Sequence, residues 1–323
     1  MPLTAHIASA LRLSPQRIVV TGANGWLGRS TLDLLHDALG DAFAERVVCF
    51  GSRRAEVRLS ATHVIEQCPL SEIGALPRQP TLLLHFAFLG KERAEAMPEA
   101  EYRAANRAIR QAVLDALDPI GVEAAFVAST GAARHADDAS ASPAMRLYGT
   151  LKREDEEAFA SWAEARGVSA VIGRIFNISG PHINKLNSYA LSSFVLDALA
   201  GRPVVVRARH DVRRGYVAIR ELMSLVFALL LERQSGVTRF DSGGNEIELG
   251  ALAAMIASSL DCPVERPATG QGAPDIYLGN DPAYRRLLGR HAIASVPLAE
   301  QIAETAAFLK TGSARRASQD VYA

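Results

Sequence analysis

The stretch Thr21-Gly22-Ala23-Asn24-Gly25-Trp26-Leu27-Gly28 decides the fold of this 323-residue chain. It follows the apolar run 17–21 (RIVVT) and precedes a segment with helical spacing. Glycines at such a junction permit a tight turn, let backbone N–H groups approach a pyrophosphate and let helix and strand pack closely. The anion then lies at the positive end of the helix. The stretch therefore predicts a dinucleotide-binding turn whose cofactor contacts are Gly22, Asn24, Gly25, Trp26, Leu27 and Gly28.

Further apolar runs repeat this pattern along the first half of the chain. They are 46–50 (RVVCF), 81–86 (TLLLHF), 123–129 (EAAFVAS) and 168–176 (VSAVIGRIF). Continuous apolar strands that alternate with helices indicate a parallel sheet covered on both faces. We therefore predict an α/β class with a doubly wound parallel sheet, the Rossmann fold, and a smaller, mostly C-terminal region.

The domain boundaries follow from where the strand–helix alternation stops. We predict a nicotinamide-binding domain over 15–178, to which segments near 215–242 return. A substrate-binding region is expected over 179–311 and a disordered tail over 312–323. Helical spacing predicts helices over 186–200, 219–232, 248–260 and 298–310.

The charge balance limits the classes of partner. Lys and Arg together number 35, as do Asp and Glu, so no global field draws the chain to nucleic acid or anionic lipid. No apolar run reaches membrane-spanning length. Cys49, Cys68 and Cys262 show neither metal-ligand spacing nor an even count. We expect a cytoplasmic protein without a metal site.

The end of the second predicted strand bears on the choice of cofactor. An acidic side chain there would accept hydrogen bonds from the adenosine ribose, whereas arginine suits a 2′-phosphate. This chain has Gly51-Ser52-Arg53-Arg54 and no acid, so Ser52, Arg53 and Arg54 are expected to contact the cofactor. NADPH is favoured, and NAD is the alternative if the arginines are only surface charge.

Tyr148 and Lys152 lie four residues apart in the predicted helix 145–166, so they project from one face. A neighbouring ammonium favours the phenolate form of a tyrosine, which makes the phenol a better proton donor and acceptor near neutral pH. The pair therefore predicts proton transfer beside the cofactor. The alternative is a core tyrosine with a lysine that reaches to solvent.

Two hydroxyls, Ser129 and Thr130, close the strand 123–129. Ligands of doubly wound sheets bind at the carboxyl ends of the strands. We predict that Thr130 hydrogen-bonds the reacting substrate oxygen and that Ser129 lies at the substrate or caps the strand.

In their order and spacing these motifs resemble the extended short-chain dehydrogenase/reductase family, of the NAD-dependent epimerase/dehydratase type that modifies nucleotide-sugars. The resemblance covers nearly the whole chain. Besides the turn and the Tyr-Lys pair, its motifs are LLLHFA with His85, Asn106 in the following helix, Arg174-x-x-Asn177-x-x-Gly180-Pro181, Arg214-Gly215-Tyr216-Val217, Leu288-Gly289 and Val296-Pro297-Leu298.

The resemblance implies a role for several residues. Thr130, Tyr148 and Lys152 would form the catalytic triad, and Lys152 would also bind a cofactor ribose hydroxyl. Phe86, Ala87 and Asn106 would lie against the cofactor. The substrate contacts implied are Asn177 for the nucleotide-sugar, Arg214 for its diphosphate, and His182, at a position that carries a catalytic acid in one branch of the family. A homodimer through the helices 99–117 and 145–166 is also implied.

Departures from the family pattern reduce the number of reactions expected of this chain. Gly131-Ala132 follow Thr130 where the dehydratases carry an Asp-Glu pair that removes and returns protons, so water elimination is not expected. Arg220-Glu221 replace two acids after the Arg214 motif, which puts the entry into the next helix in doubt.

We therefore predict an NADPH-dependent reductase of a nucleotide-linked 4-keto-deoxysugar. A nucleotide-sugar 4-epimerase with tightly bound NAD is the alternative. A non-catalytic nicotinamide-binding sensor is a third hypothesis, and the retained Tyr148 and Lys152 argue against it.

Overall fold

The computed structural model describes residues 2–59, 63–268, 270 and 272–312. The chain divides into two compact units. The first unit comprises Met1–Ile175 and Met223–Phe240, and the second comprises Phe176–Leu222 and Asp241–Ala323. The predicted tail, apart from its first residue, lies outside the described residues. The functions assigned above to the two domains stay predictions.

The first unit contains an eight-stranded sheet with the strand order β11-β7-β6-β5-β1-β2-β4-β3. From β7 to β4 neighbouring strands are parallel, whereas β3 is antiparallel to β4. The predicted class, a doubly wound α/β fold with a mostly parallel sheet, is confirmed. The strands are β1 (Arg17–Thr21), β2 (Val47–Gly51), β3 (Ala55–Arg58), β4 (Val64–Pro69), β5 (Thr81–His85), β6 (Val122–Thr130), β7 (Ser169–Ile175) and β11 (Gly236–Asp241).

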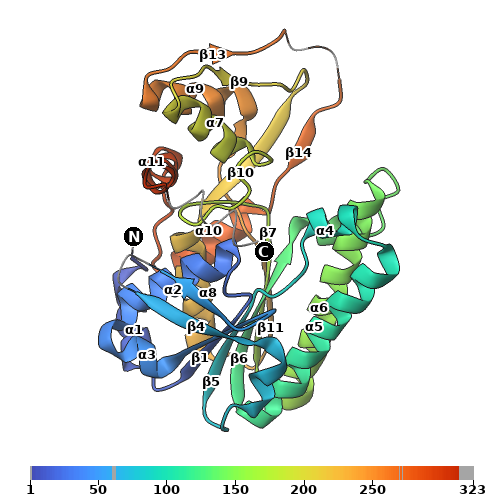
Figure 1. Ribbon diagram of the computed structural model, residues 1–323, viewed down its shortest axis with the longest axis vertical. Helices are drawn as coiled ribbons and strands as arrows, with labels where there is room; N and C mark the ends of the chain where they lie inside the picture. The colour runs from blue at the N-terminus through green and yellow to red at the C-terminus, as the bar shows by residue number, and fades with distance from the viewer. Residues whose placement is uncertain (1, 60–62, 269, 271, 313–323) are drawn as a thin grey trace. The chain divides into compact units, whose positions relative to one another are not determined.

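Helices cover both faces of this sheet, α5 and α6 on one and α2 and α8 on the other (Figure 1). The core beneath α5 and α6 joins strand residues such as Leu83 and Ile172 to helix residues such as Val113 and Phe159. The helices are α1 (Ala5–Leu13), α2 (Trp26–Leu39), α3 (Phe43–Arg46), α4 (Lys91–Ala96), α5 (Glu99–Ile120), α6 (Pro143–Arg166) and α8 (Ile219–Glu232), with 3₁₀ turns η1 (Gly40–Ala42), η2 (Leu70–Ala75) and η3 (Gly131–His135). The first four residues of α8 belong to the second unit.

Local sequence signals set the limits of α6. Ser142 caps the first turn by accepting a hydrogen bond from the Met145 N–H, and Pro143 occupies the first helical position. Gly167 ends the helix in the left-handed conformation, at φ 63°. These caps fix the register of α6, and with it the positions of Tyr148 and Lys152.

The second unit is built around β10 (Val212–Ala218). This strand pairs in parallel with β8 (Asn177–Ser179) and β14 (Asp275–Tyr277), and antiparallel with β12 (Glu246–Glu248). The remaining elements are β9 (Val204–Val205), β13 (Val264–Glu265), α7 (Ala190–Leu199), α9 (Leu249–Leu260), α10 (Asp281–Arg290) and α11 (Leu298–Lys310). The helix predicted over 186–200 begins only at Ala190, because residues 186–189 form a turn.

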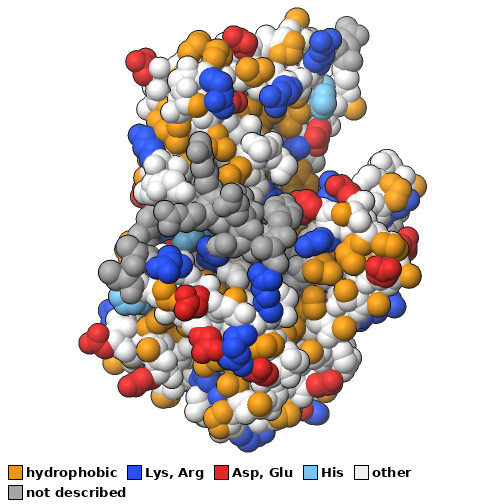
Figure 2. Space-filling view, viewed as in Figure 1, with side chains coloured by type: hydrophobic (Ala, Val, Ile, Leu, Met, Phe, Trp, Pro, Cys, Tyr) orange, Lys and Arg blue, Asp and Glu red, His pale blue; other side chains and the backbone are white. Residues whose placement is uncertain are grey.

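Charges of both signs are interspersed with apolar side chains on the face shown in Figure 2. Within the described part of the chain, no helix has the length and apolar character needed to cross a membrane.

Candidate active site

The glycine turn joins β1 to α2 in the first unit. Gly22 has φ +73°, and the Gly25 N–H donates to the Gly22 carbonyl at 3.0 Å, which closes the turn. A Cβ on Gly28 would lie 2.3 Å from the Gly22 oxygen, so this position admits only glycine. Gly25 is exposed at the start of α2, where the first N–H groups of a helix have no partners inside the helix. These residues therefore fit a bound pyrophosphate.

The segment after β5 packs directly on this turn. A Cβ on Gly22 would lie 2.6 Å from the Ala87 nitrogen, and the Phe86 N–H donates to the Thr21 carbonyl at 3.1 Å. His85 is buried, and its Nδ1 lies 2.8 Å from the Thr21 hydroxyl. Burial lowers the pKa of His85 to about 3, and nearby Lys152 adds to this shift, so the imidazole is neutral. Phe86 and Ala87 thus lie beside the turn, as cofactor contacts would require.

Of the other residues of the stretch, Asn24 precedes α2, and Trp26 and Leu27 begin it. Asn24 accepts a hydrogen bond from the Arg29 guanidinium at 3.0 Å, Trp26 is buried, and Leu27 is half-buried. The backbone N–H groups of this first helical turn are the groups that would bind a pyrophosphate.

At the end of β2, residues Ser52, Arg53 and Arg54 are exposed. Arg54 forms ion pairs with Glu66 and, at 2.6 Å, with Glu72. The guanidinium predicted to bind a 2′-phosphate therefore already has two carboxylate partners.

The Gln67 side chain fills the space that a side chain on residue 51 would need. A Cβ on Gly51 would lie 2.2 Å from the Gln67 amide. The Gln67 side chain is buried and donates to the Arg53 carbonyl at 2.9 Å. Its Oε1 has no hydrogen-bond partner among the described residues. A buried amide from β4 thus fills the space beside Gly51 at the end of β2.

Tyr148 and Lys152 lie one turn apart on α6, with Tyr148 half-buried and Lys152 only 5% exposed. Lys152 Nζ donates to the Ala128 carbonyl of β6 at 2.7 Å and lies 3.9 Å from the centre of the Phe88 ring. A Cβ on Gly149 would lie 2.2 Å from the Ala132 oxygen. This glycine therefore lets α6 pack against η3, the turn that follows Thr130.

The two hydroxyls at the end of β6 have different partners. Thr130 Oγ1 accepts a hydrogen bond from the Ala132 N–H at 3.2 Å and caps η3. Ser129 donates to Glu156, which also receives two hydrogen bonds from Arg174 at 2.8 and 2.7 Å. Ser129 is thus part of a buried polar cluster with Glu156 of α6, whereas Thr130 is the last residue of β6 and caps the turn that follows.

Burial shifts the ionisation of the groups around Lys152. It lowers the pKa of Lys152 to about 8, against the opposing effect of Asp155 and Glu156. Burial also raises the pKa of Asp155 to about 6, although Lys152 and Arg110 act in the other direction. Such displaced pKa values are typical of proton-transfer sites.

Asn106, the remaining predicted cofactor residue, lies on α5 and is 1% exposed. Its amide accepts from the Leu89 N–H at 2.8 Å and donates to the Tyr102 carbonyl at 3.2 Å. Through these bonds Asn106 fixes the segment after β5.

Three predicted substrate residues belong to the second unit. Asn177 is buried on β8, and its Nδ2 has no hydrogen-bond partner among the described residues. His182 is buried with φ 61°, and its ring centre lies 5.0 Å from that of Phe308. Arg214 on β10 forms an ion pair with Asp275 of β14 at 2.8 Å. The guanidinium predicted to bind the diphosphate is thus paired with the Asp275 carboxylate.

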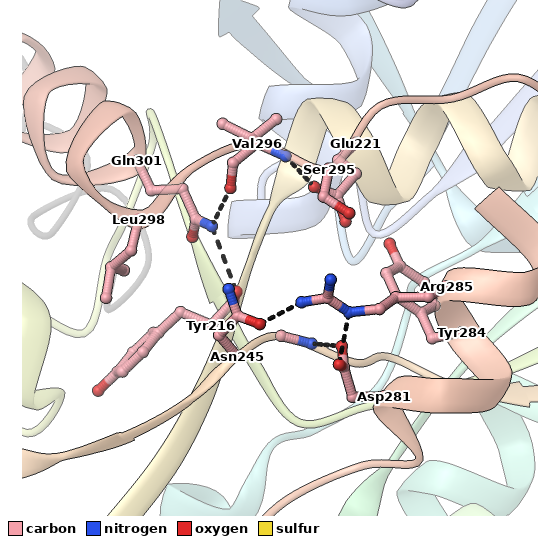
Figure 3. A pocket seen from close by; sticks show the side chains of 11 residues that line it. Tyr216, Glu221, Asn245, Asp281, Tyr284, Arg285, Ser295, Val296, Leu298 and Gln301 are labelled. Carbon is pink, nitrogen blue, oxygen red and sulfur yellow. Dashed lines mark hydrogen bonds and ion pairs between the residues drawn. The ribbon is translucent and has the colours of Figure 1, made fainter. Parts of the chain in front are cut away.

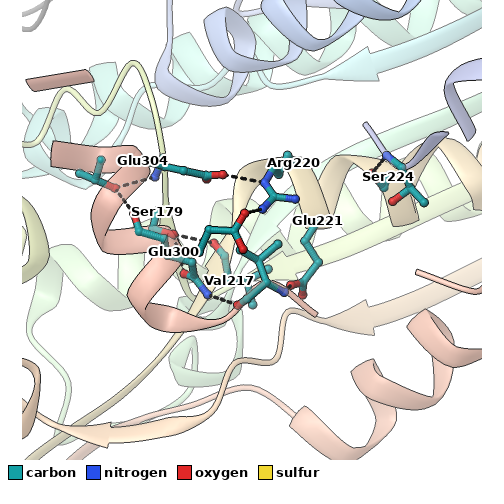
Figure 4. Close-up of polar contacts among 12 residues, drawn as sticks. Ser179, Val217, Arg220, Glu221, Ser224, Glu300 and Glu304 are labelled. Carbon is teal, nitrogen blue, oxygen red and sulfur yellow. Dashed lines mark hydrogen bonds and ion pairs between the residues drawn. The ribbon is translucent and has the colours of Figure 1, made fainter. Parts of the chain in front are cut away.

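The helix α8 begins at Ile219 and includes both Arg220 and Glu221. Arg220 forms ion pairs with Glu300 and, at 2.8 Å, with Glu304 of α11 (Figure 4). Glu221 accepts a hydrogen bond from the Val296 N–H at 2.5 Å, and burial raises its pKa to about 7. The doubt raised by the sequence at this position is therefore resolved.

Glu221 lines a cavity of about 30 Å³ within the second unit, together with Asn245, Asp281, Arg285 and Gln301 (Figure 3). This volume holds roughly one water molecule. The cavity is thus too small for a sugar nucleotide.

Comparison with known proteins identifies the family. A model of the NAD dependent epimerase/dehydratase family matches residues 18–243. The chain belongs to this family. The resemblance to extended short-chain dehydrogenases/reductases is thereby confirmed, and membership supports a nicotinamide cofactor.

Solved structures of similar fold include enzymes whose names or bound ligands are nucleotide-sugars. MoeE5 in complex with UDP-glucose and NAD is 19% identical, with a TM-score of 0.70 over 92% of this chain and 99% of that chain. A UDP-galactose 4-epimerase is 21% identical, with a TM-score of 0.65 over 92% and 99%. DesIV, a dTDP-glucose 4,6-dehydratase from Streptomyces venezuelae, is 18% identical, with a TM-score of 0.66 over 92% and 97%. At these identities the likeness concerns the fold.

Three residues that lie beside the predicted cofactor and proton-transfer residues were not predicted from the sequence. Asp155 had a signal, since an acid three residues after Lys152 shares its helix face. Phe88 follows the predicted contacts Phe86 and Ala87 directly. Gln67 gave no signal, because only strand pairing brings it to Gly51.

Proposed function

We propose that this chain is an NADPH-dependent reductase of a nucleotide-linked 4-keto-deoxysugar. The observation that carries the proposal is the half-buried Tyr148 one turn before the buried Lys152, on the helix packed against the end of β6. The solved structures of similar fold named above act on or bind UDP- and dTDP-linked sugars, which supports the substrate class.

The residues of the chain have separate roles in this reaction. A bound nicotinamide supplies the hydride for the carbonyl carbon. Tyr148 donates the proton to the oxygen that becomes the 4-hydroxyl, and Lys152 stabilises the phenolate that remains. Thr130 hydrogen-bonds the same oxygen and holds it at the tyrosine. Asn177, Arg214, Ser129 and His182 are proposed to bind the nucleotide-sugar, with Arg214 exchanging Asp275 for the diphosphate.

The cofactor preference rests on the end of β2. Gly51 provides no carboxylate to repel a 2′-phosphate, and Arg53 and Arg54 follow it. The glycine turn and the segment around Phe86 and Ala87 are proposed to hold the remainder of the dinucleotide.

A second candidate is a nucleotide-sugar 4-epimerase that keeps NAD tightly bound. One observation favours it: Glu66 and Glu72 neutralise Arg54, which reduces the attraction for a 2′-phosphate. The solved structures whose names include NAD also support this candidate. Elimination of water stays outside the proposal, because Gly131 and Ala132 provide no acid or base.

Cofactor stoichiometry distinguishes the two candidates. UDP- and dTDP-linked 4-keto-6-deoxysugars are added to purified protein with NADPH, and one NADPH is expected to be oxidised for each sugar reduced. Interconversion of UDP-glucose and UDP-galactose without net NADPH consumption would overturn the reductase in favour of the epimerase.

Tyr148→Phe tests the proton donor in either reaction. Turnover should fall by roughly two to four orders of magnitude, whereas cofactor affinity should stay close to that of the unaltered chain. Unchanged turnover would remove Tyr148 from the mechanism, and absence of turnover in every assay would favour the sensor hypothesis.

We further propose that the chain works as a cytoplasmic homodimer through α5 and α6. The three cysteines are free thiols, as a reducing compartment permits. Light scattering coupled to size-exclusion chromatography tests the dimer, and a monomeric mass would exclude it.

A further inference from the structure

Phe88 contacts both members of the proton-transfer pair. Lys152 Nζ lies 3.9 Å from the centre of its ring, within the range of a cation–π interaction. The Tyr148 ring meets it edge-to-face, with 5.6 Å between ring centres and 72° between planes. We infer that Phe88 is a positioning residue, whose ring holds the Lys152 ammonium and the Tyr148 phenol in their relative places.

The backbone beside Phe88 is fixed by two side chains of α5. Asn106 accepts the Leu89 N–H at 2.8 Å, and the Tyr102 hydroxyl donates to the Leu89 carbonyl at 2.6 Å. Both side chains are buried, and the Asn106 amide also donates to the main-chain carbonyl of Tyr102 at 3.2 Å. Both hydrogen-bonding groups of Leu89 are therefore held, and Phe88 is attached to a rigid segment.

The surroundings of Lys152 explain why an aromatic face matters there. Its ammonium has three donors, and the structure gives one of them to the Ala128 carbonyl. Asp155 and Glu156 on α6 favour the charged form, but Arg110 of α5 lies 3.3 Å from Asp155 and offsets part of that carboxylate's field. The neutral His85 of β5 adds no charge. A ring face stabilises a cation without needing to be a hydrogen-bond acceptor.

This role rests on the proposed function, since Phe88 matters to turnover only if Tyr148 and Lys152 transfer the proton. Phe88 keeps the lysine charged and aimed at the tyrosine. Its own ring takes no part in the chemistry.

Fluorinated phenylalanines inserted at position 88 test the inference. Fluorine withdraws charge from the ring face while it changes the shape of the ring little. The chain has only four lysines, so ¹³C-lysine NMR resolves the titration of Lys152, with Lys152→Arg assigning its signal. We expect its pKa to fall below about 8 in steps as fluorine is added, by roughly 0.5 to 1.5 pH units over the series.

Two variants control for packing. Phe88→Tyr retains the ring and should retain the Lys152 titration. Phe86→Leu removes the neighbouring ring, which packs on Phe126 at 6.0 Å, and should leave that titration unchanged. A Lys152 pKa that stays constant across the fluorinated series, or that shifts equally in Phe86→Leu, would overturn the inference. Because no turnover is measured, this result is independent of the Tyr148→Phe test of the proposed function.

Discussion

At the scale of single residues, Asp155 shows what burial does to a carboxyl group. It is 2% exposed, its Oδ1 is 3.3 Å from Arg110, and its Oδ2 has no hydrogen-bond partner among the described residues. Burial raises its pKa to about 6, so the folded chain binds this proton more tightly than the unfolded chain does. A raised pKa makes stability fall as the pH rises, because the ionised form is the one that burial disfavours.

Asp155→Asn should therefore remove a pH dependence. In the unaltered chain this carboxyl stabilises the fold fully below pH 3.8, and that contribution is lost as the pH rises through about 6. The free energy of unfolding of Asp155→Asn, relative to the unaltered chain, should increase by roughly 2 to 3 kcal/mol from pH 4 to pH 7. Urea unfolding at several pH values measures it. The exposed Glu157 on the same helix gives the control Glu157→Gln, and equal behaviour of the two variants would contradict the prediction.

At the scale of elements, the junction of β1 and α2 depends on close backbone contacts. Gly28→Ala places a methyl group 2.3 Å from the Gly22 oxygen and 2.7 Å from the Ala23 oxygen. Backbone atoms cannot withdraw as a flexible side chain can, so the turn must open. We expect a loss of about 1–3 kcal/mol in the free energy of unfolding and at least a tenfold weaker affinity for NAD(P)H.

Gly74→Ala is the matched control for this substitution. Gly74 lies in η2 of the same unit, and a Cβ there would meet nothing within 4 Å. Titration of cofactor fluorescence gives both affinities. Comparable losses in the two variants would show that the turn has no special requirement for glycine at Gly28.

Elements defined by neighbouring residues were predicted from the sequence, whereas elements defined by pairing with distant segments were not. Helical spacing predicted a helix over 145–166, and α6 begins only two residues earlier, at Pro143. Continuous apolar runs likewise predicted most of the parallel strands. The small strands of the second unit, such as β14, have two or three residues and take their shape from pairing with β10. Their own residues lack an alternating apolar pattern, so they could not be predicted.

The candidate site divides in the same way. Tyr148, Lys152 and the glycines follow from spacing along the chain, because helix and turn geometry fix their relation. The partners of Arg54, which are Glu66 and Glu72, come from separate elements. Their approach depends on tertiary folding, and for that reason the sequence predicted the arginine without its two acids.

At the scale of the whole molecule, the two units differ in what they offer a cofactor. All residues of the glycine turn and the proton-transfer pair lie in the first unit. A ligand stabilises the unit that binds it by about 2.7 kcal/mol at a concentration of one hundred times Kd. Adding NADPH or NAD should therefore raise the unfolding temperature of the first unit by several degrees, as measured by differential scanning calorimetry.

Comparing NADPH with NAD in this experiment shows which of the two the chain binds more tightly. At equal concentration the larger shift marks the tighter ligand, NADPH for the reductase and NAD for the epimerase. If the scan shows two transitions, the one that belongs to the second unit should stay in place. Failure of both dinucleotides to shift any transition would contradict a nicotinamide cofactor.

The packing of Gln67 against Gly51 limits how this chain can change its cofactor through mutation. Gly51→Asp would introduce the carboxylate that selects NAD in many relatives of this fold, but its Cβ would meet the Gln67 amide already there. The amide is the end of a flexible side chain, so it can move away, but it then loses its hydrogen bond to the Arg53 carbonyl. The free-energy cost of a carboxylate at position 51 therefore depends on the side chain at position 67. An engineer who wants to change the cofactor should vary the two positions together.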